Sequence, residues 1–152
     1  MPNPEIVNIF LEEAFDIVSQ WERECLKLEK NIKDPEFNGL FRCIHNLKGV
    51  ARSVGLIELG EFVCNVEEVV VLLKTQRLEL LPKVVEFLLD CQNLLVDWLQ
   101  NLQKSMDYPP HTKSLLLKME AIKSYVVCLE GEDKKNCSLF VEDIGLNWQM
   151  LI

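Results

Sequence analysis

The sequence lacks the long apolar run, about 18 residues, that a membrane-spanning helix requires. Its amino-terminal segment also lacks the basic start and apolar core of a secretory signal. These absences predict a soluble protein located in the cytoplasm. Repeats, low-complexity stretches and convincing strand patterns are missing as well, which leaves helix as the dominant expected structure.

Basic residues are also scarce, because 16 lysines and arginines stand against 24 acidic residues and give a net charge of -8. A field of that sign repels phosphate groups, which argues against nucleic acid and anionic membranes as primary partners. The sequence has no Gly-rich nucleotide loop and no kinase signature, so phosphorylation from ATP would require another domain or protein.

Cysteines number six, but none forms a CxxC pair, and most lie among helical apolar residues. In a chain of 152 residues, large enough for an ordinary core, they are predicted to be reduced, with a zinc site as the weaker alternative. The six are Cys25, Cys43, Cys64, Cys91, Cys128 and Cys137.

Apolar residues at helical spacing predict an all-α protein. N-cap residues, prolines and glycines mark the ends of four predicted helices, at about 4–31, 35–54, 56–76 and 79–106. A fifth predicted helix includes 115–129. The first is expected to bury Ile6 and Ile9, and the second to begin at Asp34-Pro35-Glu36. Short connections favour an up-and-down antiparallel four-helix bundle, with the fifth helix added at its carboxyl end.

The chain is divided into a bundle domain, 1–130, and a carboxyl-terminal extension, 131–152, which is expected to pack on the bundle. Phe140, Trp148 and Leu151 give this extension an apolar tail. Met1 and that tail favour a natural stand-alone protein over a fragment of a larger kinase.

Only two histidines are available for chemistry. His111 follows two prolines in a loop and is interpreted as an ordinary exposed residue. His45 lies beside the apolar stripe of the second helix, with Lys48 and Gly49 one turn further on. An exposed imidazole is a nucleophile near pH 7, and a nearby cation pairs with an anionic group attached to it. From these residues alone, a boundary histidine beside a solvated lysine remains the simpler interpretation.

The longer string His45-Asn46-Leu47-Lys48-Gly49 followed by Gly55 resembles the HxxKGxxxxxG signature of histidine-containing phosphotransfer (HPt) domains. The closest resemblance is to the type found at the amino terminus of chemotaxis histidine kinases, in helix order over about 4–130. The resemblance implies that His45 accepts a phosphoryl group on its outward ring nitrogen. It also implies that Lys48 steadies the phosphoryl oxygens or the partner, and that Glu67 holds the other ring nitrogen.

Glu68 is the alternative to Glu67, and a solvated surface glutamate is the simpler interpretation of either. Two residues depart from the pattern: Cys64 stands where many such domains have a second histidine, and Val50 replaces a common glycine. His45, Cys64 and Glu67 resemble a metal site, but a fourth ligand is missing and Lys48 opposes a cation, so no metal is expected.

The resemblance implies a phosphorelay intermediate, of the chemotaxis type, that receives phosphate from a histidine kinase or phosphorylated receiver. It passes that phosphate to an aspartate of a response regulator, whose receiver domain supplies Mg²⁺. The chain itself is expected to bind no cofactor and to be a monomer. The competing interpretation is a non-catalytic helical adaptor that binds signalling partners. Residues expected to form the docking surface around His45 are Arg42, Asn46, Gly49, Arg52, Cys64, Glu68 and Val71.

Overall fold

The structure, a computed structural model, describes residues 3–31, 33, 35–76, 82–104 and 110–130. Within those residues it contains five α-helices and no strand, which confirms the predicted all-α class. Their bounds are α1 Pro4–Lys30, α2 Asn38–Ser53, α3 Ile57–Gln76, α4 Pro82–Gln103 and α5 Lys113–Glu130. The predicted extension, 131–152, lies outside the described residues, and so does its tail with Phe140, Trp148 and Leu151.

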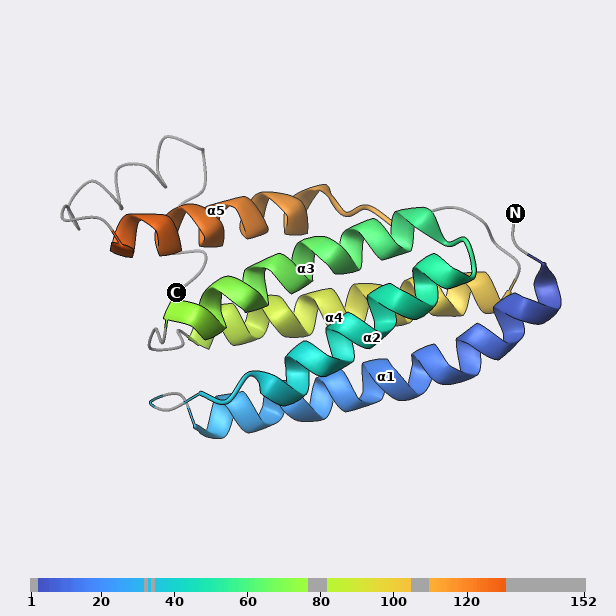
Figure 1. Cartoon of the computed structure of the whole chain (residues 1–152), viewed down its shortest axis with the longest axis horizontal. Coiled ribbons are helices and arrows are strands. Elements are labelled where there is room, and N and C mark those ends of the chain that lie inside the picture. Colours follow the sequence, from blue (N-terminus) through green and yellow to red (C-terminus); the bar gives the residue numbers. More distant parts are fainter. Residues whose placement is uncertain (1–2, 32, 34, 77–81, 105–109, 131–152) are drawn as a thin grey trace.

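The first four helices lie alongside one another as a bundle, and α5 covers one side of it (Figure 1). Helix α1 packs against both α2 and α4, α2 packs against α3, and α5 packs against α3 and α4. The centre is filled by large apolar side chains, among which Trp21, Phe10 and Phe87 are at most 2% exposed. Burial of this apolar surface is the main force that holds the bundle together.

The first two turns of α1 contribute less to the core than predicted. Ile6 and Ile9 are 47% and 70% exposed, so their assignment to the core was wrong. In the same turns, Val7 packs against the core and Phe10 is buried, so Ile6 and Ile9 lie on the face of α1 that points away from the bundle. The predicted cap is confirmed, because the Asn3 side chain accepts a hydrogen bond from the Glu5 amide at 2.9 Å, with Pro4 in the first turn.

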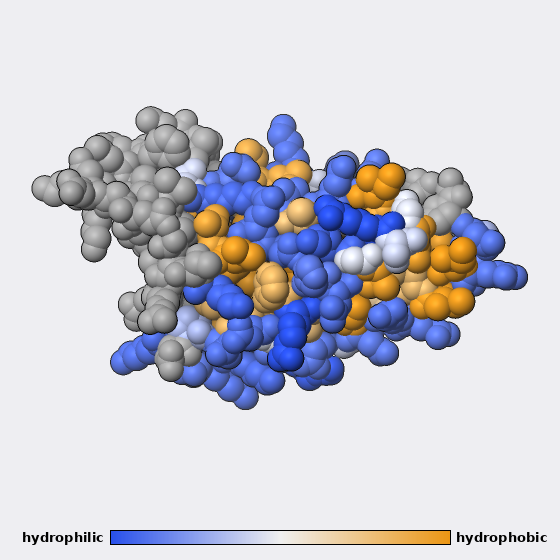
Figure 2. All heavy atoms as spheres, viewed as in Figure 1, coloured by the Kyte–Doolittle hydropathy of each residue, from blue (hydrophilic) through white to orange (hydrophobic). Residues whose placement is uncertain are grey.

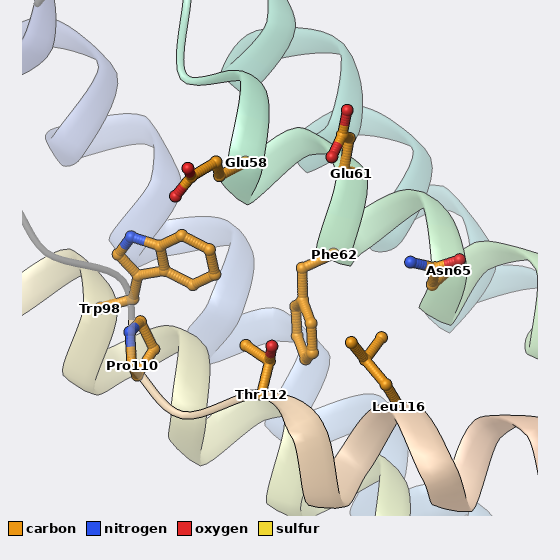
Figure 3. Close-up of a pocket in the computed structure, with 8 residues that line it drawn as sticks. All are labelled: Glu58, Glu61, Phe62, Asn65, Trp98, Pro110, Thr112 and Leu116. Carbon is orange, nitrogen blue, oxygen red and sulfur yellow. The ribbon is translucent and has the colours of Figure 1, made fainter.

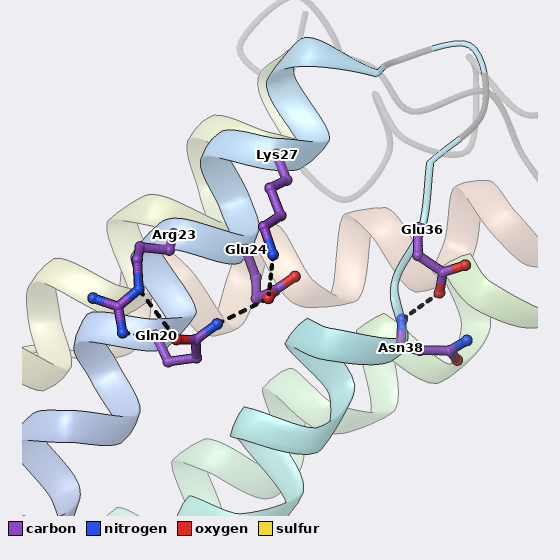
Figure 4. A network of polar contacts seen from close by, with 6 residues as sticks. All are labelled: Gln20, Arg23, Glu24, Lys27, Glu36 and Asn38. Carbon is purple, nitrogen blue, oxygen red and sulfur yellow. Dashed lines mark hydrogen bonds and ion pairs between the residues drawn. The ribbon is translucent and has the colours of Figure 1, made fainter.

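The predicted start of α2 at Asp34-Pro35-Glu36 was wrong, because the helix begins at Asn38. The N-cap residue is Phe37, whose side chain makes no cap, and the Glu36 carboxylate before it accepts a hydrogen bond from the Asn38 amide at 2.9 Å (Figure 4). The same figure shows the facing surface of α1, where Gln20, Glu24 and Lys27 are linked by side-chain hydrogen bonds.

The turn between α2 and α3 determines how the functional residues meet. Gly55 has φ of 85°, a backbone conformation that favours glycine. The Leu56 amide donates to the Ala51 carbonyl at 2.9 Å, and the Gly55 amide donates to the Arg52 carbonyl at 3.1 Å. This Schellman arrangement ends α2 and reverses the chain direction. His45 and Glu67 therefore lie at similar distances from the turn, about 15 and 18 Å at 1.5 Å per residue.

The last two helices differ from the prediction only at their ends. Helix α4 begins at Pro82, where a missing amide proton costs nothing, and the expected preceding residues 79–81 lie outside the described part. Phe62 of α3 and Trp98 of α4 contact each other with their ring centres 6.2 Å apart. Among the described residues, no helix is both long and apolar enough to cross a membrane.

Candidate functional site

His45 lies in the middle of α2 and at the edge of its buried face. Its neighbours Ile44 and Leu47 are fully buried, whereas 59% of the His45 side chain is exposed. The rigid core below thus fixes the backbone of this residue while its ring reaches solvent. His111, the other histidine, is also exposed but precedes α5 in a non-helical segment.

Glu67 of α3 connects His45 to Lys48. One carboxylate oxygen, Oε2, lies 2.9 Å from His45 Nδ1, and the other, Oε1, accepts a hydrogen bond from Lys48 Nζ at 2.7 Å. The Glu67 side chain is only 14% exposed, and that of Lys48 is 16% exposed. The carboxylate and the ammonium therefore form a largely buried support beneath an exposed imidazole.

This arrangement determines the state of both partners. Burial opposes ionisation of Glu67, but the hydrogen bonds from Lys48 and His45 outweigh it and lower the Glu67 pKa from its usual 4.5. An ionised carboxylate has no proton to donate, so the neutral ring must carry its proton on Nδ1. The lone pair is then left on Nε2. An imidazole held in this way presents one defined nucleophilic atom.

Two residues at the site were not singled out from the sequence. The Phe41 ring stacks on the His45 ring with centres 5.8 Å apart and planes 19° from parallel, and Lys74 Nζ lies 5.1 Å from the Phe41 ring centre. Phe41 precedes His45 by one helical turn, a spacing that predicts contact. Lys74 comes from α3, and no local signal in the sequence connects it with Phe41.

Glu68, the alternative partner of His45, faces a different helix. Its carboxylate accepts a hydrogen bond from Lys123 of α5 at 2.7 Å. Val71, one turn from Glu67, is 38% exposed, and both glutamates line a shallow groove with Val71 and Lys123. Cys64 lies one turn before Glu67 and is half-buried with a free thiol.

The remaining residues of the expected docking surface lie on the outer face of α2. Arg42, Asn46, Gly49 and Arg52 are all exposed. A Cβ atom added to Gly49 would meet nothing within 4 Å, so packing inside the molecule does not require glycine there. Figure 2 shows apolar surface at the end of the bundle where α1 begins and α2 ends, and a further apolar area in the other half of this face. Ile57, 66% exposed, lies at that end.

The cysteines contribute no cross-link among the described residues. Cys25, Cys43, Cys64 and Cys91 are free, and the reduced state of these four stays a prediction. The side chains of Cys128 and Cys137 lie outside the described part. Within that part, no group of three or more histidine, cysteine or acidic side chains is placed to hold a metal ion.

The fold and the site together define a small all-helical module that presents one exposed imidazole, supported by a carboxylate from the next helix. The family model described as "Hpt domain" matches residues 5–105, and the chain belongs to this family. At the level of the family, this places the chain in phosphorelay signalling through histidine phosphotransfer, as the resemblance implied.

Similar proteins include "Chemotaxis protein CheA" of Rhizobium meliloti (strain 1021), 33% identical over 94 residues, which are 61% of this chain and 12% of that protein. "Chemotaxis protein CheA" of Borreliella burgdorferi is 27% identical over 100 residues, 65% of this chain and 12% of that protein. "Sensor histidine kinase CheAY" of Helicobacter pylori is 28% identical over 92 residues, 60% of this chain and 12% of that protein. The chain therefore spans about an eighth of these relatives. No solved structure matches it.

Proposed function

We propose that His45 accepts a phosphoryl group on Nε2 and passes it to an aspartate of a response-regulator receiver domain. The observation that carries this proposal is the contact between His45 Nδ1 and Glu67 at 2.9 Å, on a side chain that is 59% exposed. A non-catalytic adaptor would need neither an exposed ring nor a carboxylate that fixes its tautomer.

In the proposed transfer, His45 forms and then breaks a bond to phosphorus. The Nε2 lone pair forms a bond to phosphorus while the donor's bond breaks. In ATP held by the kinase this is the bond from the γ-phosphorus to its bridging oxygen, with ADP leaving, and in a phosphorylated receiver it is the P–O bond to the aspartate. The ring becomes cationic as this bond forms, and its Nδ1 proton stays in the hydrogen bond to Glu67. The carboxylate stabilises that new charge, an interaction that strengthens toward the transition state. Transfer onward reverses these bond changes.

Lys48 is proposed to act mainly through Glu67, because its Nζ already lies 2.7 Å from Oε1. It lowers the free energy of the ionised carboxylate and holds it in place beside Nδ1. Phe41 is a further positioning residue, since its ring restricts rotation of the imidazole that stacks on it. Glu67, Lys48 and Phe41 together orient the ring, and only His45 forms a covalent bond.

The proposed partners are a histidine kinase that uses ATP and a receiver domain that supplies Mg²⁺ for the phosphoryl oxygens. The proposed docking surface consists of the exposed α2 residues around His45, which are Arg42, Asn46, Gly49 and Arg52. The similarity to CheA proteins supports a chemotaxis-type pathway. We place the reaction in the cytoplasm, where such kinases bind ATP, and propose that the chain acts as a monomer.

The test is a transfer assay with purified chain, candidate kinases, ATP and Mg²⁺, followed by addition of candidate receiver domains. We expect phosphate to enter the wild-type chain and then to appear on a receiver. His45→Gln is expected to take up none, and His111→Gln, which removes the other histidine, is the matched control that retains uptake. Equal labelling of His45→Gln and the wild-type chain would refute the proposal.

A further inference from the structure

Helix α5 lies outside the family match, which ends at residue 105, yet it packs against α3 beside the phosphotransfer site (Figure 1). This packing brings Lys123 of α5 within 2.7 Å of the Glu68 carboxylate. Glu68 follows directly on Glu67, the residue that holds His45 Nδ1. A helix beyond the part of the chain that the family model matches therefore reaches the surroundings of His45.

Between these two helices lies an open groove of about 360 Å³, the α3–α5 groove. Its apolar surface comes from Val71, which is 38% exposed, and from Leu72, which packs against the core. Val71 follows Glu67 by one turn, about 6 Å along the axis of α3. Apolar surface that is open to solvent thus begins next to the carboxylate that supports the imidazole.

The charged groups that line the α3–α5 groove are already paired within the chain. Glu67 contacts His45 and Lys48. Glu68 accepts a hydrogen bond from Lys123. A charged ligand would have to compete with these pairs, whereas an aliphatic group would cover the apolar surface and leave them intact. The groove therefore favours an aliphatic side chain.

The hollow at the start of α5 differs from this groove (Figure 3). Its two large rings, Phe62 and Trp98, are only 4% and 6% exposed, so they offer almost no surface to a ligand. Its exposed side chains include Glu58 and Glu61, and exposed carboxylates are ordinary on a solvated helix. Of the two, the α3–α5 groove is the one that presents apolar surface to a partner.

A receiver domain that takes the phosphoryl group from His45 has to cover this groove. An aspartate side chain is short, so the receiver backbone around it must come next to the imidazole. A specific contact between two proteins covers about 600 Å² or more on each of them, a patch roughly 25–30 Å across. Val71, one turn from the residue that contacts His45, lies well within a patch centred on the ring. The γ-phosphate of ATP stands at the end of a triphosphate, so the kinase that holds it need not approach so closely.

We propose that the α3–α5 groove receives an aliphatic side chain of the receiver domain during phosphotransfer. This inference rests on the proposed function, and it adds α5 to a docking surface otherwise formed by α2 and α3. Val71 is the apolar contact at the centre of the groove, and the paired Glu68 and Lys123 form its polar rim.

The test measures phosphate transfer from the chain to a receiver domain that accepts it from the wild-type protein. Each protein is first phosphorylated with phosphoramidate, a small donor that requires no kinase. Val71→Asn makes the exposed apolar side chain polar, and we expect the KM for the receiver to rise about fivefold. Leu26→Asn is the matched control, because Leu26 is 42% exposed on α1, and its KM should equal that of the wild type. An unchanged KM in Val71→Asn, or an equal rise in both variants, would overturn the proposal.

NMR locates the contact independently of the kinetics. Unlabelled receiver domain, added to the chain with ¹³C-labelled methyl groups, should shift the Val71 and Leu72 methyl resonances and leave those of Leu26 in place. Absence of a shift at Val71 would overturn the proposal.

Two further outcomes are distinguishable. Slower phosphate uptake from a kinase by Val71→Asn, with an unchanged KM for the receiver, would assign the groove to the kinase and refute the proposal. A wild-type chain that transfers phosphate to no receiver would refute the proposed function and this inference with it. Equal transfer by the wild-type chain and Val71→Asn would refute the groove alone.

Discussion

Replacing Glu67 by alanine removes the carboxylate that supports His45, and we predict a slower but still measurable phosphoryl transfer. The hydrogen bond between the two side chains joins a charged acceptor to the ring at 2.9 Å. Bonds to charged groups contribute about 1.5–3 kcal/mol. Because the His45 side chain is 59% exposed, the low end of this range applies.

A loss of about 1–2 kcal/mol in transition-state stabilisation corresponds to a rate about 5- to 30-fold lower. The nucleophile itself remains, so the rate does not fall to zero. The assay is the initial rate of phosphate uptake from a kinase at fixed concentrations, with circular dichroism to confirm that helix content is unchanged.

Glu13→Ala is the matched control, because it removes an exposed carboxylate from α1, a helix that carries no residue of the site. We expect this variant to take up phosphate at nearly the wild-type rate. An unchanged rate in Glu67→Ala, or an equal reduction in Glu13→Ala, would refute the reasoning that Glu67 activates the ring.

Three further predictions concern stability and reactivity. Because the Glu67 pKa is lowered in the folded state, the ionised carboxylate stabilises the fold fully at pH values above about 5. This stabilisation should disappear as the pH falls through the lowered pKa. The free energies of unfolding in urea of the wild-type chain and of Glu67→Gln should therefore become equal in acid. Gly49→Ala should raise the free energy of unfolding by about 1 kcal/mol, because alanine favours the helix over glycine and the new Cβ meets nothing within 4 Å. Slower phosphoryl transfer to a receiver in this variant would show that a partner contacts the backbone at Gly49. Burial raises the pKa of Cys25 to about 12, so iodoacetamide followed by mass spectrometry should label half-buried Cys64 well before Cys25; equal labelling in the folded protein would contradict the structure.

Much of the architecture could be predicted because helix signals are local. The Asn3-Pro4 start and the glycine at position 55 are each explained by a few neighbouring atoms, and both were identified from the sequence. The start of α2 was misplaced because Asp34-Pro35-Glu36 is a typical start signal, whereas the N-cap of the helix is Phe37, whose side chain has no capping oxygen.

The site was predictable only in part, because its contacts join two helices. The exposure of His45 follows from its place beside a buried stripe, and its pairing with Glu67 was implied by resemblance to a family. The pairing of Lys48 with Glu67 and the position of Lys74 over Phe41 depend on the packing of α2 against α3. Residue spacing within one helix carries no information on such contacts.

The most direct test of the central claim is to identify the atom of the chain that carries the phosphoryl group. NMR of the ¹⁵N-labelled, phosphorylated chain distinguishes the two ring nitrogens of His45. The account predicts phosphate on Nε2, with the proton retained on Nδ1 beside Glu67. Phosphate on Nδ1, or on any residue other than His45, would contradict it.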